Sequence, residues 1–164
     1  MSLNKIFKNY YLETVIILVI FFLDRISKLF VIHQDKLNFN SEIYSSKYLN
    51  IHLIWNEGIA FGLFSFNEDY LYNFLTFLIL MVIIFIIFMI RKSDLLRKYA
   101  LLLVLGGALG NFFDRLIYKG VPDFIDFHVG NFHWFIFNVA DIFITMGVVF
   151  MIIFELSNKK EKFE

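Results

Sequence analysis

The chain has 164 residues, which is enough for one domain and short of two typical domains. Hydrophobic residues make up 59% of it and the mean hydropathy is +0.69, more apolar side chain than a soluble protein of this size can bury. The net charge of zero gives no reason to expect nucleic-acid binding, and the lack of cysteine excludes disulfides and thiol catalysis. The composition therefore predicts one integral membrane domain over residues 1–164.

Four apolar stretches are each long enough, at about 20 residues, to cross a bilayer as a helix. They cover residues 12–32, 71–90, 99–117 and 134–156. The predicted fold class is therefore an all-α membrane protein with four transmembrane helices. The first stretch follows basic residues, as a cleavable signal peptide would, but it lacks an Ala-x-Ala cleavage site, so we expect a retained helix.

Two segments, 33–70 and 118–133, connect these spans on the same side. In residues 49–55 (LNIHLIW) apolar residues recur at every second position, which predicts a strand lying at the membrane surface. Leu37 and Phe39 suggest a partner strand. The second segment is interpreted as a loop.

Basic residues are concentrated on one side of the predicted spans. That side carries nine of them and the other side three: Lys5, Lys8, Arg91, Lys92, Arg97, Lys98, Lys159, Lys160 and Lys162 against Lys36, Lys47 and Lys119. Cytoplasmic loops are enriched in Lys and Arg. Both termini are therefore predicted to be cytoplasmic, and the segments 33–70 and 118–133 to face the exterior.

Polar residues interrupt three of the four spans, where they are costly in lipid. With a rise of about 1.5 Å per residue, Asp24 lies roughly 12 Å from the outer end of its span, Asn111 roughly 9 Å and Asp141 roughly 10 Å. Three helices therefore place polar groups in one outer layer. This coincidence predicts a single polar site that opens toward the exterior.

Several charged groups also have structural interpretations. Asp24 and Lys28 are four residues apart on one helix face and can neutralise each other. Asp114 and Arg115 can form an interfacial ion pair. Asp126 has the sequence context of a solvated loop carboxylate.

Spacing separates the remaining candidates. Gly106 and Gly110 form a small-x-x-x-small pattern that is typical of helix packing. Asp141 has no basic neighbour in its own helix, and an unpaired carboxylate at that depth indicates function. His128 and His133 are five residues apart without an H-E-x-x-H arrangement, so they make a poor zinc site.

A second carboxylate gives Asp141 a chemical role. If Asp123 folds back over the last span, it approaches Asp141, and two carboxylates that share a site do not both ionise readily. The ionised member can take a proton from water while the neutral member donates to a carbonyl oxygen, which is amide hydrolysis without a covalent intermediate. Serine and cysteine nucleophiles are poorly supported, since no Ser has the context of a nucleophile elbow.

Five motifs together resemble the bacterial lipoprotein signal peptidases (signal peptidase II). In chain order they are Asp24-x-x-x-Lys28, Asn56-x-Gly-x-Ala-Phe-Gly, Gly-Asn-x-x-Asp-Arg at 110–115, Val-x-Asp-Phe-Ile at 121–125 and Phe-Asn-x-Ala-Asp at 137–141. The resemblance implies an intramembrane aspartic endopeptidase of the inner membrane. Its expected reaction removes signal peptides from diacylglyceryl-modified prolipoproteins, cutting just before the lipidated cysteine.

The resemblance also implies roles for individual residues. Asp123 and Asp141 would form the catalytic dyad. The supporting polar residues would be Asp24, Lys28, Asn56, Asn111, Asp114, Arg115 and Asn138. Arg25 stands where the family commonly has an uncharged polar residue. Ile59 stands where the family commonly has a small residue, and the larger side chain would narrow the substrate groove.

The same resemblance implies a small β-cradle on the extracytoplasmic surface and neither a metal nor an organic cofactor. The expected partners are lipid-modified prolipoproteins and membrane lipid, with no nucleic acid, and we expect a monomer.

Two other functions account for part of the sequence. A small proton-coupled carrier would use Asp24, Asp114 and Asp141 as a relay, but it predicts polar groups through the whole membrane depth, and here the inner half of every span is apolar. A non-enzymatic assembly subunit would use Gly106 and Gly110 for packing and would leave Asp141 unexplained. The peptidase is therefore the function that we predict.

Overall fold

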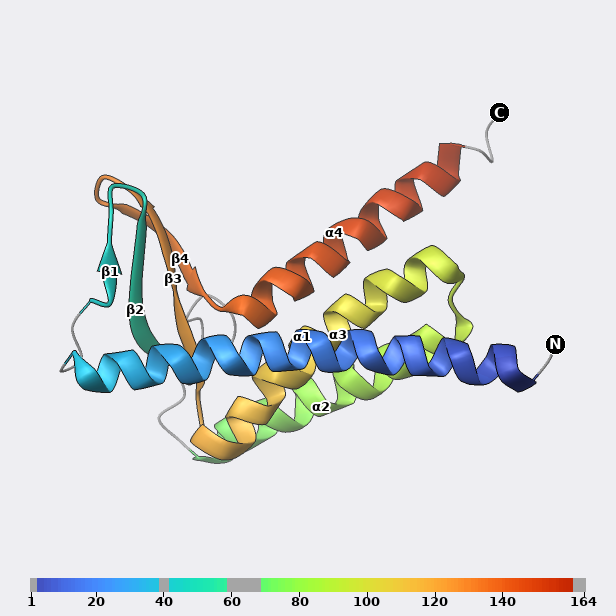
Figure 1. Cartoon of the computed structure of the whole chain (residues 1–164), viewed down its shortest axis with the longest axis horizontal. Coiled ribbons are helices and arrows are strands. Elements are labelled where there is room, and N and C mark those ends of the chain that lie inside the picture. The colour runs from blue at the N-terminus through green and yellow to red at the C-terminus, as the bar shows by residue number, and fades with distance from the viewer. Residues whose placement is uncertain (1–2, 39–41, 59–68, 161–164) are drawn as a thin grey trace.

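The computed structural model describes residues 3–38, 42–58 and 69–160. These residues form four helices and one four-stranded antiparallel sheet (Figure 1). The helices are α1 (Leu3–Leu37), α2 (Asp69–Lys92), α3 (Leu95–Tyr118) and α4 (Val139–Lys160). The strands are β1 (Tyr44–Ser45), β2 (Leu49–Asn56), β3 (Val121–Val129) and β4 (Phe132–Phe137), in the spatial order β1-β2-β3-β4.

Within the described residues, three helices are long and apolar enough to cross a membrane. These segments are Tyr72–Lys92, Leu95–Tyr118 and Val139–Ser157. They correspond to the second, third and fourth predicted spans. Three of the four predicted spans are therefore helices with the length and apolar composition that a membrane span requires. α1 is the longest helix, at 35 residues, and it carries three charged residues near its middle.

The largest difference from the sequence prediction lies between residues 118 and 138. Instead of a loop followed by a helix from residue 134, the chain forms the β3–β4 hairpin, and α4 begins only at Val139. The apolar run Trp134-Phe135-Ile136-Phe137 suits a helix or a strand equally well, so its periodicity does not decide between them. Gly130 is the deciding residue. It has φ 61° and stands first in a two-residue turn, which is the position that glycine favours in tight hairpins.

The alternating segment 49–55 is confirmed as a strand, β2, which pairs with β1 and β3. The predicted partner strand near Leu37 is wrong, because α1 continues through that residue. Phe39 lies outside the described residues, as does Ile59. The fold class is thus helical with a sheet larger than the predicted cradle.

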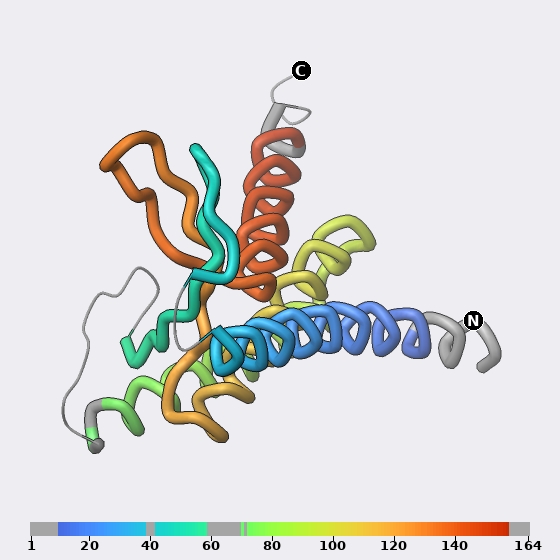
Figure 2. The backbone as a smooth tube through the Cα atoms, turned by 60° about the vertical axis from the view of Figure 1, so that its left-hand side comes forward, coloured from blue at the N-terminus to red at the C-terminus, as the bar shows by residue number. Residues whose placement is uncertain are grey.

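Figures 1 and 2 show how the sheet stands relative to the helices. The N-terminal end of α1, the link between α2 and α3, and the C-terminal end of α4 lie at one end of the molecule, and the sheet lies at the other. In both views the β3–β4 hairpin and α4 diverge from the point where β4 ends and α4 begins. Residues of β3, β4 and α4 line a pocket, which is described below.

Helix α3 packs against α1 through its predicted pair of small residues. A Cβ atom added at Gly106 would lie 2.8 Å from the Cβ of Ile20. One added at Gly110 would lie 2.5 Å from Oδ2 of Asp24. The packing role predicted for both glycines is therefore confirmed, and Gly110 also makes room for a charged side chain.

Two further glycines let α3 and α4 approach each other. A Cβ atom at Gly107 would lie 2.5 Å from the carbonyl oxygen of Ala140, and one at Gly147 would lie 2.6 Å from the carbonyl oxygen of Ala100. Both obstacles are backbone atoms, which cannot move without moving a helix. On its other side α3 packs on α2 through a buried apolar cluster: Ile83, Ile86, Ile90, Leu101, Leu102 and Leu105.

Replacing Gly107 by alanine should destabilise the protein because the added methyl group pushes α4 away from α3 at Ala140. Overpacking of this kind typically costs about 1–3 kcal/mol, so we expect a clear loss of thermal stability in detergent. Gly120→Ala is the matched control, since its nearest neighbour would lie at an ordinary 3.5 Å. Equal melting temperatures for the two variants would contradict the close packing of α3 on α4.

Candidate active site

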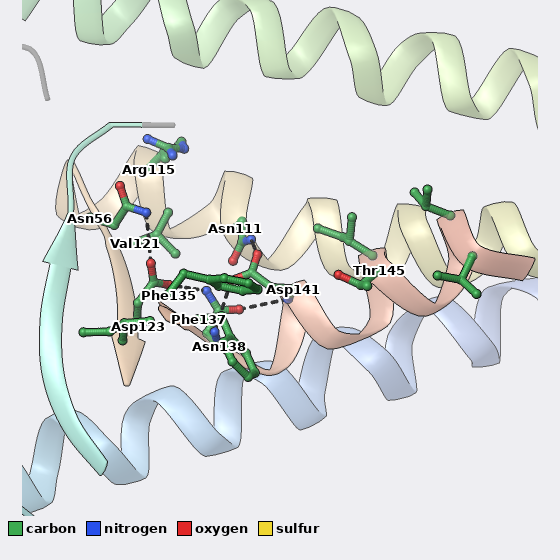
Figure 3. A pocket seen from close by; sticks show the side chains of 14 residues that line it. Asn56, Asn111, Arg115, Val121, Asp123, Phe135, Phe137, Asn138, Asp141 and Thr145 are labelled. Atoms are coloured by element: carbon green, nitrogen blue, oxygen red, sulfur yellow. Dashed lines mark hydrogen bonds between the residues drawn. The ribbon is translucent and has the colours of Figure 1, made fainter. Parts of the chain in front are cut away.

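The structure brings Asp123 of β3 and Asp141 of α4 into one pocket (Figure 3). Asn138, between β4 and α4, contacts both carboxylates. Its Nδ2 donates to Oδ1 of Asp123 at 2.5 Å, and its backbone N–H donates to Oδ2 of Asp141 at 3.1 Å. Asp123 lies in a strand rather than in the predicted loop, and it is only 4% exposed. One asparagine thus connects the two acidic residues.

Asp141 is positioned by a reciprocal helix cap. The Asn138 Oδ1 accepts a hydrogen bond from the Asp141 N–H at 3.2 Å, while the Asp141 carboxylate accepts from the Asn138 N–H. Each side chain satisfies a backbone N–H group that the start of a helix leaves free. Asp141 is therefore the third residue of α4, and the prediction that it lies seven residues inside a span is wrong.

A second asparagine holds Asp123 from the other side. Asn56, at the end of β2, donates from Nδ2 to Oδ2 of Asp123 at 2.9 Å. Its Oδ1 accepts from the Gly58 N–H at 3.0 Å. This second bond fixes which end of the Asn56 amide faces the carboxylate, so Asp123 receives one side-chain donor on each oxygen.

A third asparagine connects Asp141 to α1. Asn111 of α3 donates from Nδ2 to Oδ1 of Asp141 at 2.8 Å, and its Oδ1 accepts from Nζ of Lys28 at 2.7 Å. Because an ammonium group can only donate, the amide oxygen of Asn111 must face Lys28. Its NH₂ group must then face Asp141. The charge on α1 therefore sets the direction of a hydrogen bond in the pocket.

Lys28 belongs to a buried group of four charges that joins α1 to α3. Its Nζ contacts Asp24 at 2.9 Å and Asp114 at 2.7 Å. Arg25 donates to both oxygens of Asp114, and from Nη2 to Asp24 at 2.9 Å. Two acidic and two basic residues balance, so the group carries no net charge. The predicted pairing of Asp24 with Lys28 is confirmed.

Arg115 takes a different position from its predicted one. Asp114 pairs with Arg25 and Lys28, and Arg115 instead donates from Nη2 to the carbonyl oxygen of Gly58 at 2.5 Å. Its Nε and Nη1 atoms are buried and have no hydrogen-bond partner among the described residues. Because Arg115 also lines the pocket, it can offer these donors to a ligand.

The pocket itself has a volume of about 490 Å³ and is polar at one end. The polar end is formed by the groups described above: Asn56, Asn111, Arg115, Asp123, Asn138 and Asp141. The other lining residues are mostly apolar: Val121 of β3, Phe135, Ile136 and Phe137 of β4, and Ile144, Thr145, Val148 and Val149 of α4. The shape and chemistry of the pocket suit a ligand with an apolar segment next to a polar group.

The pocket makes Asp123 a weaker acid than an ordinary aspartate. Burial, assisted by repulsion from Asp141, raises the pKa of Asp123 to about 6. The hydrogen bonds from Asn56 and Asn138 and the charge of Lys28 oppose this rise. At pH values near 6 the pair of carboxylates can therefore hold one proton and one negative charge, the combination that a proton donor and a proton acceptor require.

Two features of this region were not predicted from the sequence. Arg25 completes the four-charge group, and its adjacency to Asp24 was the available signal. Asp126, predicted to be a solvated loop carboxylate, is instead buried in β3, 1% exposed, and contacts His133. Asp126, His128 and His133 are the one group of potential metal ligands within the part of the chain that the structure describes, and all three lie outside the pocket.

Comparisons with known proteins identify relatives along most of the chain. A family model described as signal peptidase (SPase) II matches residues 16–157. A lipoprotein signal peptidase from Pelagibacter ubique is 53% identical, over 96% of this chain and 97% of its own. A lipoprotein signal peptidase from Anaplasma phagocytophilum is 37% identical, over 90% of this chain and 93% of the relative's own length.

Two solved structures of bacterial membrane enzymes, determined by the in meso method, have the same fold. One matches with a TM-score of 0.76 at 27% identity and covers 92% of this chain and 90% of its own. The other has a TM-score of 0.74 at 28% identity, with coverage of 88% and 92%. The family model and the relatives together show that the chain belongs to the signal peptidase II family of peptidases.

Proposed function

We propose that this peptidase cleaves prolipoproteins by aspartic chemistry, with Asp123 and Asp141 as its catalytic pair. Removal of lipoprotein signal peptides in the bacterial inner membrane is the activity of the family. The observation that carries the proposal is the bridging of both carboxylates by Asn138 at the polar end of one pocket.

The two carboxylates take opposite roles in the proposed reaction. In this proposal Asp123 carries the shared proton and Asp141 starts ionised. Asp141 takes a proton from water as the water oxygen attacks the peptide carbonyl carbon, and Asp123 donates its proton to the carbonyl oxygen. The tetrahedral intermediate then collapses: Asp141 protonates the leaving nitrogen, the C–N bond breaks, and a hydroxyl proton returns to Asp123.

The surrounding polar residues keep these two groups in place. Asn56 and Asn138 hold Asp123, Asn111 holds Asp141, and Arg115 offers its unpartnered donors to carbonyl oxygens of the substrate. The buried charges do not touch the pocket. Asp24, Lys28 and Asp114 act as positioning residues that join α1 to α3.

The apolar lining of the pocket suits the substrate that the family resemblance implies. The apolar part of a signal peptide would lie along α4, beside Ile144, Val148 and Val149. The diacylglyceryl chains would remain in lipid, and the bond before the lipidated cysteine would lie at the carboxylate end.

In the proposed membrane arrangement α1 is a fourth span. Its charges near the middle, Asp24, Arg25 and Lys28, face inward and are neutralised by Asp114. Its outward-facing side chains around them are apolar and exposed: Leu18, Val19, Phe22, Leu23, Ile26, Leu29 and Phe30. The basic α2–α3 link lies at the same end as both terminal helix ends, which supports cytoplasmic termini and a site toward the outer face (Figure 1).

Cysteine labelling tests this orientation, and the absence of native cysteine makes single-cysteine variants specific. A cysteine replacing Lys47 should react with an impermeant reagent added to intact cells. A cysteine replacing Lys92 should react only after the membrane is opened. Labelling of the Lys92 variant from outside would contradict the proposed orientation and place the pocket on the wrong side.

Replacing either catalytic carboxylate by its amide should abolish cleavage. Asp123→Asn and Asp141→Asn keep the shape of the side chain but cannot cycle a proton, so the protein should still insert and accumulate. The double variant should be little worse than either single one, because the pair acts as a unit. The measurement is conversion of precursor to mature lipoprotein, normalised to inserted protein.

The control for these variants is Asp94→Asn, at the start of α3. Asp94 is exposed and caps the helix through the Arg97 N–H, a role that asparagine fills equally well. Its conversion should match the wild type. Near-normal conversion by either Asp123→Asn or Asp141→Asn would remove the proposed mechanism.

The pH profile reports the proton on Asp123. Since that proton is required, kcat/KM should fall as the pH rises through about 6, the pKa of Asp123 in the free enzyme. Asn56→Leu removes a hydrogen bond that lowers this pKa. Its alkaline limb should therefore move to higher pH. An unchanged limb in Asn56→Leu would assign the titration to another group.

A further inference from the structure

A second cluster of chemically active side chains lies on the β3–β4 hairpin. Asp126 and His128 belong to β3, and His133 belongs to β4. His128 and His133 are paired across the hairpin, and their rings stack with centroids 5.1 Å apart at an angle of 22°. Nδ1 of His133 lies 2.8 Å and 3.0 Å from the two oxygens of Asp126. The three side chains therefore face one another on the same part of the sheet.

An irregularity in the hairpin brings Asp126 close to the two histidines. The pairing of β3 with β4 shifts register between Asp126 and His128. Such irregularities bend a strand and re-aim its side chains. Asp126 pairs across the sheet with Ile136, yet its carboxylate reaches His133. The two histidines are five positions apart, and this spacing alone does not reveal that Asp126 lies beside them.

The cluster has donor atoms that could bind a cation and that the contacts within the cluster leave unused. The Asp126 carboxylate is almost fully buried, and its basic partner among the described residues is His133, whose side chain is 52% exposed. Nδ1 of His128 is buried and has no hydrogen-bond partner in the described part of the chain. One potential ligand atom from each residue lies within 4.8 Å of the other two. A buried carboxylate and two imidazoles whose ligand atoms lie this close together are a set of donors that a metal ion would satisfy.

We propose that Asp126, His128 and His133 bind one divalent transition-metal ion of the zinc class. Two imidazole nitrogens and one carboxylate oxygen suit zinc, whereas calcium and magnesium prefer oxygen ligands alone. With metal–ligand bonds of about 2.0–2.2 Å, two ligands of one ion lie roughly 3–4 Å apart, so the cluster has to close by up to about 2 Å. His133, half exposed, has room to make that adjustment, and water would complete the coordination.

The bound ion would connect the two strands of the hairpin without entering the catalytic pocket. Asp123 lies three residues before Asp126 on β3, and β4 leads directly into Asn138. A metal bridge between the strands would therefore fix their register and, through it, the separation of the catalytic carboxylates. None of its three ligands lines that pocket, so the ion has no place in the hydrolytic step.

Titration of the purified full-length protein with Zn²⁺ tests the proposal. The protein should be prepared in detergent without a histidine tag, stripped with chelator, and titrated in competition with a chromophoric chelator. We expect one ion per chain, with the affinity reduced at least tenfold in His128→Ala and in His133→Ala. His33→Ala is the matched control: His33 is an exposed histidine of α1, and its variant should bind as the wild type does.

Two additional measurements separate metal binding from folding and from catalysis. His133→Gln keeps a side chain that can hydrogen-bond to Asp126, so it should retain the melting temperature of the metal-free protein while losing affinity for Zn²⁺. Asp123→Asn should lose cleavage and keep full Zn²⁺ binding, because the catalytic carboxylate is not a ligand of the ion. Absence of saturable binding, or equal affinity in the wild type, His128→Ala and His133→Ala, would overturn the proposed site.

Discussion

The site depends on one side chain, Asn138, which sits where the sheet ends and α4 begins. It caps the helix, accepts from the Asp141 N–H and donates to Asp123. An amide carries both a donor and an acceptor at its tip, so a single residue can serve all of these contacts. An aspartate would cap the helix equally well, but it would have no hydrogen for Asp123 and would add a third negative charge to the pocket. The hairpin and the helix are thereby joined at the point where the two acidic residues must meet.

Helices α1 and α3 support the pocket through a charged side chain and the hydrogen bonds that it orients. Lys28 orients Asn111, and Asn111 in turn donates to Asp141, so a charged side chain of α1 determines a contact in the pocket. The ion pairs between α1 and α3 weigh against a proton-relay carrier. Asp24 and Asp114 are fully buried, and each is held in ion pairs with two basic groups that join α1 to α3.

Local sequence patterns predicted the features that depend on neighbouring residues. They gave the apolar helices, the alternating strand β2, the pairing of Asp24 with Lys28 and the small residues of α3, because each follows from one periodicity or one spacing. The proximity of Asp123 to Asp141 was a hypothesis that assumed a fold-back of the chain, and the family resemblance, not a local pattern, supported it. What the local patterns missed involves contacts between distant segments. Arg25 binds a residue 89 positions away, and the burial of Asp126 follows from pairing across a hairpin whose apolar strand looked like the start of a helix.

The composition of the four-charge group has a consequence for how the protein is made. α1 contributes one acid, Asp24, and two bases, Arg25 and Lys28, so this part of the helix has a surplus of positive charge on its own. The carboxylate that balances it, Asp114, belongs to α3 and is synthesised some ninety residues later. If α1 spans the membrane as proposed, the nascent chain must hold it in a polar or shielded environment until α3 arrives. Insertion of the first helix is then completed by the third, and biogenesis of the whole domain is cooperative rather than helix by helix.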